Sequence, residues 1–377
     1  MKVGIDASRY KFATATGVEW YSYHIINHLM PRLGRDHNSE ITLFLKEDTE
    51  FEEDFPFNVK KKVIPFGKFW TQLRLSYEMV VNRQDVLFVP SHVQPLIIPK
   101  KLIITIHDLA FKDPKLKNIY SFKERFLLNW STKRAVKKAN KIIVPSQATK
   151  DDLIKYYNCK KKKIVVIPHG APELKGENNP VLKKWTKKEK NEILKRVGLK
   201  DGELFVLYVG RLETKKNLAS LVEAFSRFRQ EYPDWKLVLA GKKGIGFEDI
   251  ISKIAKYNLE KEVIMPGYIS EKEKSFLLDK CRIFAFPSLY EGFGLPILEA
   301  FAYRKPVLTS KITAMPEIAG EAAFLVDPEN IAEISVGLKR MAFDGMLVSK
   351  LIEAGDLQLN KFDWENSAEQ TFNTIFY

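Results

Sequence analysis

A pair of glutamates around a glycine-rich turn is the most chemically distinctive feature of the chain. Glu291 and Glu299 stand eight positions apart, and the residues between them read Gly-Phe-Gly-Leu-Pro-Ile-Leu. Glycines let backbone N–H groups approach a ligand closely, and carboxylates accept hydrogen bonds from sugar hydroxyls or serve in acid–base chemistry. A polar ligand site is therefore one interpretation of this segment, and a solvated helix face is the other.

Two cations stand earlier in the same half of the chain, close to the end of an apolar run. Arg211 follows the run Leu204–Val209, and Lys216 lies at the start of a helical pattern over Leu218–Gln230. Cations beside the N-terminus of a helix form a binding site for a diphosphate. The alternative is that both residues are ordinary surface charges at the end of a strand.

The elements that must position these residues alternate between short apolar runs and helical patterns. Runs that are apolar throughout are typical of parallel strands covered on both faces, and the alternation predicts an α/β fold with two consecutive doubly wound domains. Ligands of such sheets bind beyond the carboxyl ends of the strands. The expected strands of the N-terminal half are Lys2–Asp6, Ile41–Leu45, Val86–Val89, Leu102–Ile106, Ile142–Val144 and Ile164–Ile167. Those of the C-terminal half are Leu204–Val209, Lys236–Ala240, Glu262–Met265, Ile283–Phe286 and Pro306–Leu308.

The length of 377 residues indicates two domains at about 150 residues each. A polar stretch rich in Pro, Gly, Asn and Lys runs from Gly170 to about Trp185 and is expected to be the linker. The helical pattern after Phe362 is expected to pack back across the first domain. We therefore expect an acceptor domain over 1–172, a second domain with the linker over 173–361, and a returning helix over 362–377.

The charge balance favours polyanionic partners. Lys and Arg number 61 against 47 Asp and Glu, a net charge of +14, which suits nucleic acid, an anionic lipid surface or a phosphate-bearing substrate. No helix-turn-helix, zinc-finger or RNP-like pattern supports a nucleic-acid-binding protein, so no nucleic acid partner is expected. A dinucleotide oxidoreductase is disfavoured because no Gly-x-Gly-x-x-Gly follows either first strand.

The cysteines and the apolar runs indicate the compartment. Cys159 and Cys281 lie far apart without metal-ligand spacing, which fits a reducing cytoplasm. No apolar run reaches the ~18 residues of a membrane span, and Asp6 interrupts the first apolar run before a signal-peptide core can form. We expect a cytoplasmic protein and leave open a peripheral association with the inner membrane face.

A basic stretch with aromatic residues, over about Phe122 to Lys138, allows two interpretations. It includes Phe126 and Trp130 among Lys123, Arg125, Lys133 and Arg134. An amphipathic basic helix can rest on an anionic membrane. The other interpretation is a helix with its apolar face toward the core and its basic face in solvent.

The segment from Glu291 to Glu299 resembles the Glu-x7-Glu signature of the retaining GT-B glycosyltransferases of family 4. The resemblance extends to Val209–Asn217, Leu239–Gly244, Ile167–Gly170 and Leu308–Gly320. It implies two Rossmann-like domains facing a cleft and a nucleotide-sugar donor in the second domain. The resemblance also gives each donor contact a residue: the diphosphate on Arg211 and Lys216, the ribose on Glu299, the hexose at Glu291, and backbone contacts at Gly292, Phe293, Gly294 and Leu295.

For the first domain, the resemblance implies that Gly17 approaches the phosphates and acceptor and that His107 contacts the transferred sugar. The sequence here reads Gly17-Val-Glu-Trp-Tyr21, whereas relatives commonly have a second glycine and an arginine. A lone histidine after a strand is more often a capping or packing residue, and it is the motif context that favours the sugar contact for His107. Ser146 is expected to be the N-cap of the helix that follows it.

No Asp-x-Asp pair is present to hold a divalent cation, so Arg211, Lys216 and helix dipoles are expected to steady the leaving diphosphate without a metal. No cofactor is expected either. Gly241–Gly244 and Leu325–Pro328 resemble bacterial mannosyltransferases, which favours GDP-mannose over UDP-sugars. The alternative is a UDP-sugar-dependent GT-B transferase, synthase or phosphorylase, and the acceptor is expected to be a glycan or a lipid-linked glycan.

Overall fold

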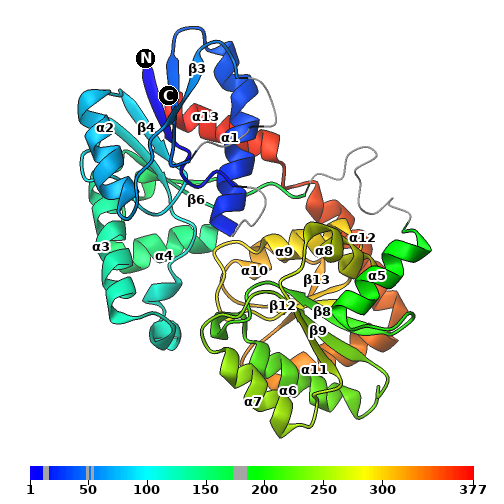
Figure 1. The fold of residues 1–377 in the computed structure, drawn as a ribbon. Coiled ribbons are helices and arrows are strands. Elements are labelled where there is room, and N and C mark those ends of the chain that lie inside the picture. Colours follow the sequence, from blue (N-terminus) through cyan, green and yellow to red (C-terminus); the bar gives the residue numbers. More distant parts are fainter. Residues whose placement is uncertain (12–16, 48–50, 52–54, 173–184) are drawn as a thin grey trace. The chain divides into compact units, whose positions relative to one another are not determined.

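The computed structural model in Figure 1 describes residues 1–11, 17–47, 51, 55–172 and 185–377. The chain forms two compact units. Unit 1 comprises Met1–Gly170 and Phe362–Tyr377, and unit 2 comprises Ala171–Lys361. Most of the expected linker, 173–184, lies outside the described residues.

Unit 1 is built on a parallel sheet of seven strands in the order β3-β2-β1-β4-β5-β6-β7. Every pairing between its strands is parallel, as the uniformly apolar runs predict. The strands are β1 Lys2–Asp6, β2 Glu40–Leu45, β3 Val59–Val63, β4 Val86–Val89, β5 Lys101–Thr105, β6 Lys141–Val144 and β7 Ile164–Val166.

Helices cover both faces of this sheet, and alternate residues of one strand face different cores. Val86 and Phe88 of β4 pack in the core under α1 and α13, whereas Leu87 and Val89 pack in the core under α2, α3 and α4. The α-helices are α1 Gly17–Arg35, α2 Leu75–Val81, α3 Phe122–Lys138, α4 Gln147–Tyr157 and α13 Trp364–Phe376. A π-helical turn, η1 Trp70–Arg74, leads into α2, and short 3₁₀ turns are η2 Ala110–Lys112, η3 Pro114–Ile119 and η4 Lys161–Lys163.

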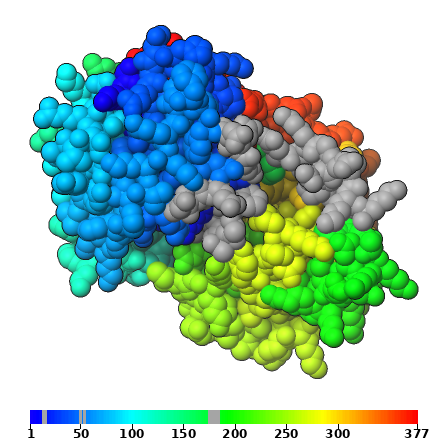
Figure 2. Space-filling model, turned by 45° about the horizontal axis from the view of Figure 1, so that its top comes forward, coloured from blue at the N-terminus to red at the C-terminus, as the bar shows by residue number. Residues whose placement is uncertain are grey.

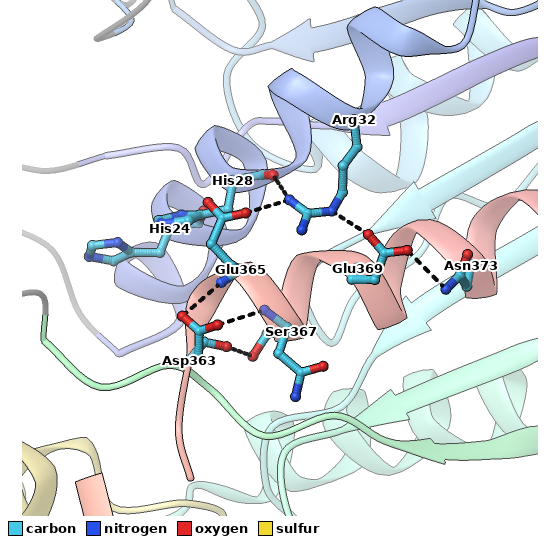
Figure 3. A network of polar contacts seen from close by, with 9 residues as sticks. His24, His28, Arg32, Asp363, Glu365, Ser367, Glu369 and Asn373 are labelled. Atoms are coloured by element: carbon cyan, nitrogen blue, oxygen red, sulfur yellow. Dashed lines mark hydrogen bonds and ion pairs between the residues drawn. The ribbon is translucent and has the colours of Figure 1, made fainter. Parts of the chain in front are cut away.

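The C-terminal helix α13 returns to unit 1 and packs against α1, as expected. Figure 2 shows red residues of the C-terminal segment beside the blue N-terminal residues. Arg32 of α1 binds Glu365 at 2.7 Å and Glu369 at 2.8 Å, which Figure 3 shows as two ion pairs from one guanidinium. Trp364 is buried so close to the backbone of Gly170 that a Cβ there would lie 2.3 Å from the indole.

Unit 2 repeats the arrangement with six parallel strands in the order β10-β9-β8-β11-β12-β13. The strands are β8 Phe205–Val209, β9 Lys236–Ala240, β10 Val263–Gly267, β11 Ile283–Phe286, β12 Val307–Ser310 and β13 Ala323–Val326. The helices are α5 Lys187–Val197, η6 Thr214–Lys216 (3₁₀), α6 Leu218–Arg229, α7 Phe247–Lys256, α8 Glu271–Lys280, α9 Leu295–Ala302, α10 Met315–Ala319, α11 Ile331–Phe343 and α12 Gly345–Leu359.

Candidate active site

The strand order of unit 2 reverses between β8 and β11, which lie side by side in the sheet. The chain continues from β8 toward β9 on one side and from β11 toward β12 on the other, so the two outgoing segments diverge at this point. Ligands of open α/β sheets bind at such a point, beyond the carboxyl ends of the strands. The segments beyond β8 and β11 are joined directly, because the Leu289 N–H donates to the Lys215 carbonyl at 2.8 Å.

Lys216 and Glu291 meet at this point in a shielded ion pair. The Lys216 Nζ lies 2.5 Å from the Glu291 Oε1, and the side chains are 14% and 11% exposed. The ammonium also stands 5.4 Å from the ring centroid of Phe286, and the Glu291 N–H donates to the Thr313 hydroxyl at 3.2 Å. The structure therefore brings a predicted phosphate ligand and a predicted sugar ligand into direct contact with each other.

The neighbouring Tyr208 is completely buried. Burial raises the pKa of the Tyr208 phenol well above its ordinary value, and the negative charges of Glu291 and Glu213 raise it further. The phenol stays protonated and donates to the Arg211 carbonyl at 2.9 Å. Carboxylates and a cation at this position act on one another, and on any ligand, with less screening than at the surface.

Arg211 follows β8 at the solvent-exposed edge of the same site. Its side chain is 62% exposed, and its Nε lies 3.7 Å from the Glu213 Oε2. The backbone beside it is fixed by a close approach of two glycines, because a Cβ at Gly241 would lie 1.7 Å from the Gly210 carbonyl oxygen. The backbone of the 210–212 segment is therefore held firmly, while its guanidinium reaches into solvent.

Glu299 is the only charged residue of α9, a helix that is otherwise apolar. It is 18% exposed and accepts from the Lys274 Nζ of α8 at 2.8 Å. Lys274 also binds Glu271 at 2.9 Å. Burial alone would lower the pKa of Lys274, but the charges of Glu299 and Glu271 outweigh it and raise the pKa. A solvated helix face is therefore the wrong interpretation of Glu299.

The two glutamates of the signature have different partners. Each is paired with a different lysine, Glu291 with Lys216 and Glu299 with Lys274. The sequence pattern did not identify Lys274, since nothing in the spacing of α8 marks it. Lys274 is identified only in the structure, where its side chain on α8 contacts Glu299 on α9.

Gly294 begins α9 in a backbone conformation that favours glycine, with a φ of +119°. Pro296 in the first turn fixes the helical geometry without needing a hydrogen-bond acceptor. The backbone of Gly292 to Leu295 therefore leads into a helix N-terminus directly after Glu291, and Phe293 is buried within this turn. This N-terminus supplies a positive dipole end beside the shielded ion pair.

His107 of unit 1 follows β5 and is held by a packed group of rings. Its Nε2 lies 3.1 Å from the Pro90 carbonyl oxygen, and its ring meets Tyr21 at 4.8 Å and His169 at 5.7 Å between centroids. A nitrogen facing a carbonyl must carry the proton, which makes Nδ1 the acceptor of the neutral ring. Burial lowers the pKa of His107, an effect that the Pro90 carbonyl and Asp108 oppose.

Gly17 is the exposed first residue of α1, and the residues before it, 12–16, lie outside the described part of the chain. A Cβ at Gly17 would have no described atom within 4 Å. Ser146 caps α4 by accepting from the Thr149 N–H at 3.2 Å, which confirms the capping role expected for it.

Among the described residues, no group of three or more His, Cys, Asp or Glu side chains is arranged to hold a metal ion. Within the same residues, no helix combines the length and apolarity that crossing a membrane requires. Both cysteines are free and buried.

Two family models match the chain. One, for glycosyl transferases group 1, matches residues 189–358, and the other, for glycosyltransferase family 4, matches residues 15–172. The O-antigen chain mannosyltransferase B of Escherichia coli is 28% identical over 285 residues, which are 73% of this chain and 70% of that protein. The serotype-specific mannosyltransferase WbdA of Escherichia coli is 28% identical over 279 residues, which are 72% of this chain and 33% of WbdA. The matched part of this chain therefore spans only about a third of WbdA's length.

Solved structures show the same architecture. Sucrose-phosphate synthase from Thermosynechococcus elongatus matches with a TM-score of 0.74 and 18% identity, covering 99% of this chain and 98% of that one. Anabaena HepE in complex with UDP and glucose matches with a TM-score of 0.71 and 19% identity over 99% and 98% of the chains. At these identities the likeness concerns the fold, and it confirms the expected GT-B architecture of two Rossmann-like domains.

Proposed function

The chain belongs to the group 1 glycosyltransferases, and we propose that it transfers a hexose from a nucleotide-sugar to a glycan or lipid-linked acceptor in polysaccharide biosynthesis. The relatives named as mannosyltransferases support the hexose, and the O-antigen relative supports a polysaccharide product. HepE, which shares the fold, was solved with UDP and glucose, and this supports a nucleotide-sugar donor.

The observation that carries the proposal is the shielded lysine beyond β8. Lys216 lies at the point where open parallel sheets bind ligands, and the Glu291 carboxylate holds it at 2.5 Å. A diphosphate bears more negative charge than one carboxylate and makes strong charge-assisted hydrogen bonds to lysine. The exposed Arg211 has room to turn toward the same anion, and the N–H groups from Gly292 to Leu295 add the dipole of α9.

Donor binding would then exchange partners within the site. When the diphosphate takes Lys216, the Glu291 carboxylate loses its cation in a poorly hydrated place, and such a carboxylate must gain other hydrogen bonds. The hydroxyls of the hexose supply them. Glu299, held by Lys274, accepts from the ribose hydroxyls in the same way.

The proposed transfer retains the anomeric configuration by attack on the front face of the sugar. The bond from C1 to the phosphate oxygen breaks, the acceptor oxygen bonds to C1 on the same face, and the acceptor proton passes to the departing phosphate oxygen. No enzymatic base is needed for this balance. The chain contributes orientation and neutralisation of the diphosphate by Lys216 and Arg211 without a metal ion, and His107 contacts the transferred sugar.

GDP-mannose is the proposed donor, because the named relatives are mannosyltransferases, and UDP-sugars are the alternative that HepE supports. The test is a screen of GDP-, UDP- and ADP-sugars that measures release of the nucleoside diphosphate, with and without a chelator. We expect the highest turnover with GDP-mannose and little effect of the chelator. A preference for a UDP-sugar would overturn the donor, and a Mg²⁺-reversible loss would overturn metal independence.

A further inference from the structure

Helix α3 of unit 1 has an unusual distribution of side chains. Its buried residues are small and mostly polar, namely Ser131, Thr132 and Ala135. Four of its large apolar residues lie in solvent: Phe122 is 84% exposed and Phe126 is 64% exposed, and Leu127 and Trp130 are also exposed. The apolar residues of α3 are therefore divided: Leu128, Ala135 and Val136 pack against the core, while the other large apolar side chains face solvent.

The neighbouring segment η1–α2 also presents an apolar stripe to solvent. Phe69, Leu73 and Tyr77 recur every four residues, and Val80 and Val81 continue the stripe, all of them exposed. This spacing places them on one side of the helix. The opposite side contributes Trp70, Leu75 and Met79 to the core.

A loop is hydrogen-bonded to both helices. The Ser76 hydroxyl of α2 accepts from the N–H groups of Leu96 and Ile97 at 2.8 and 3.2 Å. The Arg134 guanidinium of α3 donates to the carbonyls of Pro95 and Leu96. Leu96 and Ile97 are themselves exposed, so the loop that links η1–α2 to α3 also presents apolar side chains to solvent. Figure 1 shows α2 and α3 on the same side of unit 1.

Basic residues surround this surface. Helix α3 carries six basic residues against one acidic residue, Glu124, and that carboxylate is engaged in the capping box with Ser121. Around η1–α2, Lys68 and Arg83 are exposed, whereas Glu78 is buried and neutralised by Lys62 and Arg74. Exposed aromatic and aliphatic side chains within a positive rim are complementary to an anionic lipid bilayer.

We propose that this surface, called here the docking face, binds the surface of an anionic phospholipid membrane. It consists of the exposed apolar residues of η1–α2, of Leu96 and Ile97, and of α3. The aromatic side chains enter the boundary between headgroups and acyl chains while the lysines and arginines contact lipid phosphates. The inference stands on the docking face alone and does not depend on the donor or on the transfer reaction.

The test is sedimentation of the full chain with vesicles of phosphatidylcholine, with or without phosphatidylglycerol.

The apolar variant is Phe122→Ser/Phe126→Ser/Trp130→Ser. The charge variant is Lys123→Gln/Arg125→Gln/Lys133→Gln, which keeps Arg134 and its hydrogen bonds to the loop. Controls lie in unit 2: Phe343→Ser/Met346→Ser replaces two apolar residues that are at least about as exposed as Phe122, and Lys187→Gln/Lys188→Gln/Lys195→Gln removes three exposed lysines of α5. Thermal melts establish that each variant is folded.

We expect the wild-type chain to bind the anionic vesicles and to bind neutral vesicles weakly, with added salt reducing the anionic binding. The affinity of both docking-face variants for anionic vesicles should fall by roughly tenfold or more, and both controls should bind like wild type.

No binding by the wild-type chain, or equal losses in the controls, would overturn the proposal. Self-association that the apolar variant abolishes, without vesicle binding, would show that a second copy covers this face. Vesicle binding without sugar transfer would contradict only the proposed enzymatic function.

Discussion

The Lys216 Nζ lies 2.5 Å from the Glu291 Oε1 at the point where the strand order of unit 2 reverses, and both side chains are almost completely shielded. In this arrangement the carboxylate occupies the position that the proposed diphosphate would take on the lysine. Glu291 therefore has two effects of opposite sign: it competes with the diphosphate, and it binds the hexose. Substitution of Glu291 should separate the two.

Glu291→Gln should strengthen the binding of a nucleoside diphosphate and depress sugar transfer. The amide keeps the size of the side chain but removes a charge-assisted hydrogen bond to Lys216, a difference of roughly 1.5 to 3 kcal/mol in competition with the diphosphate. Calorimetry with GDP and UDP measures the affinity, and nucleotide release from the donor measures transfer. Glu223→Gln is the control, because Glu223 of α6 is similarly shielded, at 13% exposed, and pairs with Lys253 of α7 instead of a proposed donor ligand. Weaker nucleotide binding in Glu291→Gln would show that the carboxylate does not compete.

Lys274→Met should raise the KM for the donor more than it lowers kcat, because Lys274 positions Glu299 without contacting the donor. The chain should also lose roughly 1 to 3 kcal/mol of stability, since the Glu299 side chain would lose its hydrogen-bond partner in a largely shielded place. Lys274→Arg should restore most of the affinity. Lys274→Met/Glu299→Gln should recover stability and leave donor binding weak. If the double variant binds donor like wild type, Glu299 has no part in binding.

His107→Ala should leave the affinity for the nucleoside diphosphate unchanged and lower the rate of sugar transfer. His107 belongs to unit 1, and the proposed diphosphate ligands Lys216 and Arg211 belong to unit 2. Calorimetry and a transfer assay on the same preparation separate the two quantities. Ser146→Ala, which removes an N-cap, controls for a general loss of stability in unit 1. An equal loss of nucleotide affinity and transfer in His107→Ala would contradict this assignment.

Unit 1 should lose stability on acidification between pH 6.5 and about 3. Burial, aided by the charge of nearby His28, lowers the pKa of His24 to about 3. In the unfolded chain His24 takes up a proton near pH 6.5, so below that pH protons favour unfolding, by up to about 1.4 kcal/mol per pH unit. His24 stacks on Trp364 of α13, with ring centroids 4.8 Å apart and planes 12° apart.

His24→Phe keeps an aromatic ring against Trp364 and removes the titrating group. Its unfolding midpoint in denaturant should therefore fall less steeply than that of wild type as the pH is lowered from 7 to 4. His37→Phe is the matched control, because His37 stacks on the exposed Phe57. Parallel pH profiles for His24→Phe and wild type would show that another group governs the acid sensitivity.

Much of the fold could be predicted from the sequence because both sheets are covered on both faces, and strands of that kind are apolar throughout. Val86–Val89, Lys236–Ala240 and Ile283–Phe286 match strands of the structure residue for residue. The strand β3 was missed because it reads Val-Lys-Lys-Lys-Val. It lies at the edge of its sheet, where lysines are tolerated and discourage pairing with another chain.

The site could be predicted only in part. The spacing of Glu291 and Glu299 marks both residues, but spacing contains no information on which cations they meet, so Lys274 was missed. The orientation of α3 could not be predicted for a similar reason. Its pattern fits a helix facing either the core or a partner, and only the structure shows that Leu128 and Val136 pack against the core while Phe122 and Phe126 face solvent.

The most direct test of the central claim is the binding of GDP and UDP to the full chain by calorimetry, compared with Lys216→Met and with Lys253→Met. Lys253 of α7 pairs with Glu223 of α6 and serves as the control, because it is also a lysine held by a carboxylate. The proposed diphosphate site predicts saturable binding of at least one nucleotide to wild type, a loss of roughly tenfold or more in Lys216→Met, and no comparable loss in Lys253→Met. Equal affinity in all three proteins, or no binding of either nucleotide to wild type, would contradict it.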